Sequence, residues 1–140
     1  MASLNPKKPT NNNLPTLAKY NGTASLVEIR RDPERFPRIG SFSEETAASR
    51  MLSIVWAASL YRNQDLSDDK LAFIASALVA EIMNDRKYGL RQLSWEEIGV
   101  AIRAAVLGEG REMYGISVAS LFTALVDYAK GEGHEADKKA

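Results

Sequence analysis

The stretch Ser94–Tyr128, SWEEIGVAIRAAVLGEGREMYGISVASLFTALVDY, decides the fold of this 140-residue chain. Ser94, with Glu97 three residues later, has the pattern of a capping box, in which each side chain satisfies the backbone amide of the other residue. Apolar residues then recur at helical spacing, at Ile98, Ile102, Ala105 and Val106. Gly108 and Gly110 are predicted to end this helix, because glycine readily adopts the left-handed conformation of helix ends.

A second helix is predicted after the connector GEGREMYG, which begins at Gly108 and ends at Gly115. Ser117 is the expected N-cap. The apolar spacing then continues, through Val118, Leu121, Phe122, Leu125, Tyr128 and Ala129. Gly131 and Gly133 are predicted to end the helix, and the composition of residues 131–140, GEGHEADKKA, predicts a disordered tail.

The connector has two interpretations. It is either a structural turn between helices, anchored by a buried Tyr114, or a loop that meets a phosphate or a partner through Arg111 or the backbone amides at Gly108, Gly110 and Gly115. Phosphate-binding glycine loops normally follow a strand and open a helix. Because no strand is expected before Gly108, the pattern argues against nucleotide binding.

Composition points to an all-α protein, with frequent alanine and no long β-branched runs. The chain has no cysteine, which excludes disulfides, thiolate metal sites and cysteine nucleophiles. No apolar run reaches the ~18–20 residues of a membrane span, and no apolar segment of a secretory signal opens the chain. We therefore expect a cytoplasmic protein that does not enter membranes.

Two further helices precede the deciding stretch, so we expect a compact bundle of about four helices, over residues 43–63, 67–87, 94–107 and 117–130. Short connectors favour antiparallel neighbours. The helix 43–63 is apolar around much of its circumference, which is typical of a central or interface helix. Trp56 and Tyr61 are its candidate interface residues, and for Trp56 the pattern favours a role as an anchor of the core.

The domain organisation follows the charge. Residues 1–40 carry 7 Lys/Arg and 3 Asp/Glu, although the net charge of the whole chain is zero. They are interpreted as a basic, partly disordered arm, with a short helix or an extended segment near residues 23–31. The arm is followed by a helical domain, 41–130, and by the tail, 131–140.

The arm contains the candidate nucleic-acid or partner-binding residues Arg30, Arg31, Arg35, Phe36 and Arg38. Arginines interleaved with an aromatic residue grip phosphate backbones and stack on bases. The alternative is a solvated arm whose arginines pair with Asp32, Glu34 and the acidic helical body.

Catalytic signatures are lacking. The single histidine, His134, lies in the predicted tail, and the adjacent carboxylate pairs sit at helix starts, where capping and the helix dipole account for them. We expect no enzyme activity, no cofactor and no metal.

The residues Glu97, Ile98, Ala101, Ile102, Ala105, Gly108, Tyr114, Gly115 and Tyr128 match a pattern that resembles small helical proteins encoded by phages and mobile elements of gut bacteria. That pattern is an E-I-x-x-A-I-x-x-A helix, a G-x-x-G-x-x-Y-G connector and a final helix with an aromatic residue near its end. The present connector departs from it, because Gly108 and Gly110 are only two residues apart. The resemblance covers residues 43–130 and implies an accessory replication protein, of the helicase-loader or replisome-organiser kind.

Three functions follow as hypotheses. The first is a non-enzymatic helical adaptor that binds a protein partner or a second copy of itself, as an accessory to replication of a phage or mobile element. The second is a nucleic-acid-binding module that uses residues 30–38. The third is a phage structural or morphogenesis component whose arm, 1–40, becomes ordered on a neighbouring subunit.

Overall fold

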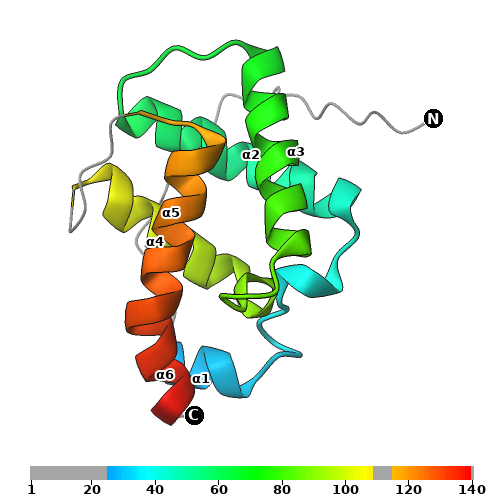
Figure 1. Ribbon diagram of the computed structural model, residues 1–140, viewed down its shortest axis with the longest axis vertical. Helices are drawn as coiled ribbons and strands as arrows, with labels where there is room; N and C mark the ends of the chain where they lie inside the picture. The colour runs from blue at the N-terminus through cyan, green and yellow to red at the C-terminus, as the bar shows by residue number, and fades with distance from the viewer. Residues whose placement is uncertain (1–24, 109–114, 140) are drawn as a thin grey trace.

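The computed structural model describes residues 25–108 and 115–139 (Figure 1). Within those ranges the protein is all-α, as predicted. Its four long helices are α2 (Glu44–Tyr61), α3 (Asp68–Asn84), α4 (Trp95–Val106) and α5 (Val118–Tyr128). Two six-residue helices, α1 (Leu26–Arg31) and α6 (His134–Lys139), pack against each other at one end of the molecule. No helix of the described residues is long and apolar enough to cross a membrane.

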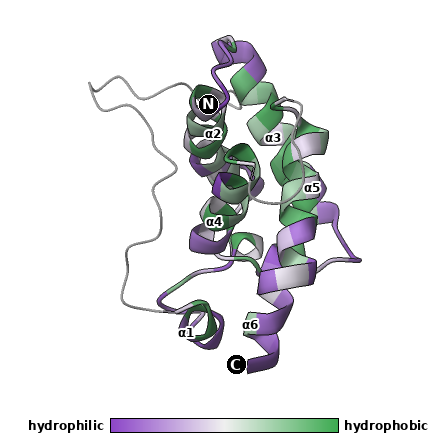
Figure 2. Cartoon of the chain, turned by 90° about the vertical axis from the view of Figure 1, so that its left-hand side faces the viewer, coloured by the Kyte–Doolittle hydropathy of each residue, from purple (hydrophilic) through white to green (hydrophobic). Residues whose placement is uncertain are grey.

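The long helices form two crossing layers. In Figure 1, α3 and α5 descend side by side, while α2 and α4 cross them and both end on the left-hand side. Figure 2, which looks at that side, shows α2 and α4 nearly end-on beside the other pair. Consecutive helices therefore cross instead of running antiparallel, which corrects the arrangement that their short connectors suggested.

Serine side chains set the start of each long helix. Ser43, Ser67, Ser94 and Ser117 each accept a hydrogen bond from the backbone amide three residues later. This satisfies one of the donors that a helix start leaves unpaired. The predicted capping box of Ser94 and Glu97 is confirmed. The predicted helix starts are therefore accurate to within a residue or two.

Helix α2 is central to the core. Its buried residues occupy much of its circumference: Ala47, Ala48, Met51, Leu52, Val55, Ala57, Ala58 and Ser59. Burial of the polar Ser59 hydroxyl is tolerated because this hydroxyl donates a hydrogen bond to the Trp56 carbonyl at 2.7 Å. Trp56 is half-buried and packs at the edge of the core, while Tyr61 is 41% exposed.

Two helix ends differ from the predictions. Helix α3 ends at Asn84, before the predicted Lys87, because the Asp85 carboxylate accepts from the amides of Lys87, Tyr88 and Leu90 and holds a turn. Burial opposes the charge on Asp85, but these amides outweigh it and lower the pKa of the carboxyl.

The predicted disordered tail is helical over the residues described. Helix α5 runs without a break into a π-helical segment, Ala129–Gly133, and then into α6. Gly131 and Gly133 therefore do not end the helix. The physical reason is tertiary: Gly133 is buried, and a Cβ there would lie 3.1 Å from both Arg30 Nη2 and a Tyr128 ring carbon. Glycine lets the helix pass close to these two side chains.

The segment before α2 is fixed against the segment before α4. The Ile39 amide donates to the Leu93 carbonyl at 2.8 Å, and Arg38 and Ser94 form an isolated antiparallel bridge. Gly40 faces Arg91, whose carbonyl oxygen and Cβ would lie 2.8 and 2.9 Å from a Cβ at this position. This approach requires glycine at residue 40.

Two alanine substitutions should therefore have opposite effects on stability. Gly40→Ala forces a clash with the Arg91 backbone and should lower the free energy of unfolding by about 1–3 kcal/mol. Gly99→Ala, inside α4 and with no atom within 4 Å of the added Cβ, should raise it by up to about 1 kcal/mol. Denaturant unfolding of both variants checks this, and a Gly40→Ala variant as stable as the native protein would contradict the close contact.

Candidate functional site

The most unusual feature of the described structure is a fully buried carboxylate, that of Glu97 in the first turn of α4. One oxygen, Oε1, accepts from the Ser94 amide at 3.2 Å and lies 3.3 Å from the Ser94 hydroxyl. The other, Oε2, accepts from Arg30 Nε at 2.8 Å and from the Tyr128 hydroxyl at 2.9 Å. A buried charge needs such partners, and here they come from three separate segments of the chain.

The Tyr128 hydroxyl is a proton donor in this network. Burial raises the pKa of Tyr128, and the charge of Glu97 and the hydrogen bond to it raise that pKa further, against the opposing effect of Arg30. The phenol therefore stays protonated well into alkaline solution. It acts as a fixed donor to Glu97 and is unsuited to act as a base.

Arg30 connects this carboxylate to two terminal segments of the described residues, 26–36 and 134–139, which are called the chain ends below. Its side chain is 11% exposed, and Nη1 lies 3.8 Å from Asp137 of α6. Ile29 and Phe36, with Leu26 beside them, form a small apolar cluster separate from the main core. The ion pair of Arg30 and Glu97 thus joins this cluster to the four-helix body.

The other candidate residues of the arm divide into two groups. Arg38 turns inward, where its guanidinium donates to the carbonyls of Ile29, Phe36 and Arg30 at 2.9, 2.8 and 2.6 Å. Phe36 is buried and so is not free to stack on a base. Arg31 and Arg35 are exposed; Arg31 donates to the Lys139 carbonyl and Arg35 lies over the Phe36 ring.

Three of the candidate residues of the connector lie outside the described residues, namely Gly110, Arg111 and Tyr114. Gly108 has a φ of 75°, the left-handed conformation predicted for the end of α4. Beyond the connector, Gln64 accepts from the Ile116 amide at 2.7 Å, which fixes the start of α5 against the loop that follows α2. Gly115 lies beside this glutamine and contributes its carbonyl to Ser120.

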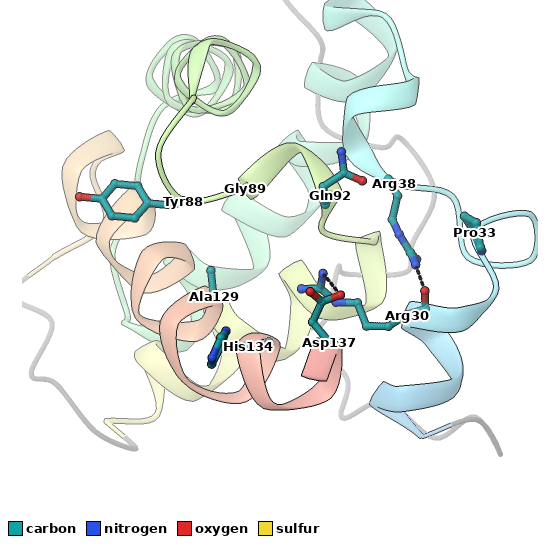
Figure 3. Close-up of a pocket in the computed structure, with 10 residues that line it drawn as sticks. Arg30, Pro33, Arg38, Tyr88, Gly89, Gln92, Ala129, His134 and Asp137 are labelled. Carbon is teal, nitrogen blue, oxygen red and sulfur yellow. Dashed lines mark hydrogen bonds and ion pairs between the residues drawn. The ribbon is translucent and has the colours of Figure 1, made fainter. Parts of the chain in front are cut away.

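A cleft of about 420 Å³ opens next to the buried carboxylate (Figure 3). The N-terminal segment contributes Arg30, Pro33 and Arg38, the turn after α3 contributes Tyr88, Gly89 and Gln92, and the C-terminal helical segment contributes Ala129, Gly133, His134 and Asp137. Sequence reasoning placed His134 in a disordered tail and missed this cleft, because its walls are about 100 residues apart along the chain.

The described residues include no group of three or more His, Asp or Glu side chains placed to bind a metal ion. The unpaired Trp95 Nε1 and Arg103 Nε are the buried side-chain polar atoms without a hydrogen-bond partner there. Arg50 lies over the rings of Phe42 and Trp95, at 5.0 and 5.8 Å, and the three residues pack as a cation–π cluster.

Comparisons of the chain with protein-family models, with curated proteins and with solved structures find no match.

Glu97→Gln should isolate the role of the negative charge. Glutamine can still form the capping box through its single oxygen, but its NH2 group then replaces the oxygen that accepts from Arg30 and Tyr128. Arg30 is left with the exposed Asp137 as its remaining counter-ion. We expect a loss of about 3 kcal/mol of unfolding free energy in denaturant titrations. Glu96→Gln, one residue earlier in the same turn, should cost less than about 0.5 kcal/mol. Equal losses in the two variants would show that the effect is general to the start of α4.

The raised pKa of Tyr128 predicts a loss of stability in alkali. The pKa of Tyr128 in the folded protein lies above the ordinary tyrosine value of 10.0, so the contribution of the neutral phenol is complete below that pH and falls as the pH rises beyond it. Tyr128→Phe should be less stable than the native protein near neutral pH, by about 1–2 kcal/mol, and should lose stability less steeply above pH ~10. Thermal unfolding against pH measures both slopes, and parallel curves would contradict the assignment.

Proposed function

We propose that the protein is a non-enzymatic helical adaptor that binds a protein partner at the end of the molecule where α2 and α4 finish. Three large apolar side chains are exposed there: Leu60 and Tyr61 in the last turn of α2 and Leu107 just after α4, with exposed fractions of 44%, 41% and 46%. The C-terminal ends of these helices lie on the same side of the molecule (Figures 1 and 2). The presence of three large exposed apolar residues at two helix ends on the same side of the molecule is the observation that carries the proposal.

The physical argument is the cost of leaving such side chains in water. Single exposed apolar residues are ordinary on protein surfaces, but several large ones at one place are typical of an interaction site. Tyrosine and leucine at a helix end can fill a hollow on a partner with little loss of conformational freedom. Trp56, one turn before Leu60 and only half-buried, extends the apolar character along α2.

An accessory role in replication of a phage or mobile element is the finer proposal, and it is supported by the resemblance of residues 43–130 alone. The matching positions that lie in described segments are mostly buried, as Ile98, Ala101, Ile102 and Tyr128 are. They therefore describe how the bundle packs and give no direct information on a partner.

Nucleic-acid binding by residues 30–38 is the alternative, and the geometry gives it less support. Arg30 is paired with Glu97, Arg38 turns inward, away from where an extended nucleic-acid backbone would pass, and Phe36 is buried. Arg31 and Arg35 remain at the surface. The third hypothesis, an arm that becomes ordered on a neighbouring subunit, concerns residues that lie mostly outside the described ranges.

Photo-crosslinking in cells that express the protein tests the adaptor proposal. A benzophenone amino acid at position 61 or 107 should form a discrete crosslinked protein species, either a dimer of this chain or a complex with another protein. The matched control is position 73, because Phe73 is 67% exposed but lies on α3, away from this end. Leu60→Ser should reduce crosslinking from position 107 without lowering the melting temperature.

Crosslinking of the same protein species from positions 61, 107 and 73 would indicate non-specific association and would contradict the proposed interface. Light scattering of the purified chain, with and without labelled single- and double-stranded oligonucleotides, then separates the alternatives. A shift with oligonucleotide that weakens steeply as salt increases would favour the nucleic-acid hypothesis.

A further inference from the structure

We propose that the cleft between the chain ends and the four-helix body binds the phosphate group of a small phosphate monoester. The cleft is lined by Arg30 and Arg38 from the N-terminal segment and by His134 from α6 (Figure 3). The three are therefore brought to one cavity from opposite ends of the sequence. This assignment is independent of the proposed protein-binding end, which lies at the C-terminal ends of α2 and α4.

Arg38 is the central group because its guanidinium is fixed and still has donors to spare. Three of its N–H groups bond backbone carbonyls, two through Nη1 and one through Nη2. A guanidinium has five such groups, so Nε–H and one Nη2–H have no acceptor among the described residues. No described carboxylate forms an ion pair with Arg38. A pre-positioned guanidinium with two uncommitted N–H groups is the arrangement that binds two oxygens of a phosphate.

Among the lysine, arginine and acidic side chains that line the cleft, Arg30 and Arg38 are cationic and Asp137 is anionic. Two lysines lie farther out: Lys87 Nζ and Lys130 Nζ are each 5.3 Å from the centre of the Tyr88 ring, and neither lysine lines the cleft. His134 adds a ring N–H in either protonation state.

Four carboxylates oppose these cations. Glu97 is fully buried and already balanced by Arg30. Asp85 is occupied by backbone amides, and Glu132 is exposed. Asp137 is therefore the carboxylate that competes directly, since it lines the cleft and its side chain is 70% exposed.

The dimensions and the polarity of the lining select a small hydrophilic ligand. A volume of about 420 Å³ falls in the usual range for small-molecule sites, ~300–1,000 Å³. Most of the lining side chains that reach into the cleft are polar, which suits a phosphate with a short organic group. Such a ligand would touch the N-terminal segment, the turn at Gly89 and α6 at once, so its binding should also stabilise the attachment of the chain ends.

Titration of the full-length chain with phenyl phosphate, followed by NMR of backbone amides at constant ionic strength and near-neutral pH, tests the assignment. Saturable shifts are expected in residues 88–92 and 129–137. Benzoate, which carries the same ring on a carboxylate, should bind at least about threefold more weakly. A carboxylate has one charge and two acceptor oxygens, and a phosphate group has more charge and more acceptor oxygens. Inorganic phosphate shows whether the phosphate alone suffices.

Two variants on α6 should move the affinity in opposite directions. His134→Ala removes a donor and should raise the dissociation constant about three- to tenfold. Asp137→Asn removes the competing carboxylate and should lower it about two- to fivefold. Glu135→Gln and Lys138→Ala, at positions of the same helix that do not line the cleft, are the matched controls and should leave it unchanged within about twofold.

The assignment would be overturned by any of three results. One is the absence of saturable shifts around the cleft. Another is an equal effect of Asp137→Asn and Glu135→Gln, which would mean that only the overall charge of α6 matters. The third is benzoate binding as tightly as phenyl phosphate, which would make the site one for the aromatic ring. Because all four substituted residues are exposed, none of these results can be blamed on failure to fold.

Discussion

The buried carboxylate of Glu97 is the constraint on which the arrangement of the chain ends depends. A charged group removed from water must be matched by donors and by an opposite charge, or it destabilises the fold by several kcal/mol. Glu97 meets this condition with Ser94 from its own turn, Tyr128 from the end of α5 and Arg30 from α1. The requirement to satisfy one carboxylate therefore fixes where two distant helices lie.

The rest of the molecule fits around this point. The main core is built mostly by α2 to α5, and Ile39, Leu90, Leu93 and Ile116 from the segments beside them complete one continuous cluster. The N-terminal segment adds its own small cluster, which would have little reason to attach to the body by apolar contact alone. The polar network supplies that attachment, and the space left between the attached segment and the body is the cleft lined by Arg30 and Arg38. The carboxylate that organises the chain ends thus also neutralises one of the two arginines that line the cleft.

The comparison of sequence and structure shows where local patterns are sufficient. Serine caps and the spacing of apolar residues are local signals, so the helix starts at Ser43, Ser67, Ser94 and Ser117 could be predicted. The capping role of Glu97 was predicted from the same kind of signal. Its second role, as the counter-ion of Arg30, depends on a contact across 67 residues and has no local signature.

The C-terminal segment shows why the predictions of a disordered tail and of a helix end at Gly131 and Gly133 were wrong. Gly131 and Gly133 carry the composition of a helix end, but the contact of Gly133 with Arg30 and Tyr128 overrides that preference, and the chain continues as a π-helical segment into α6. His134 and Asp137 therefore reach the cleft, although the composition GEGHEADKKA predicted a tail. The arginines at 30 and 38 have the composition of a nucleic-acid arm, yet tertiary contacts turn both inward.

The most direct test of this account is the heteronuclear NOE of backbone amides, measured residue by residue in Glu97→Gln and in the native protein. If the carboxylate fastens the chain ends to the body, the NOE values of residues 26–36 and 134–139 fall in the variant, while those of α2 and α3 do not change. Unchanged values at the chain ends would contradict the account and would mean that the remaining contacts hold these segments in place without the Glu97 carboxylate.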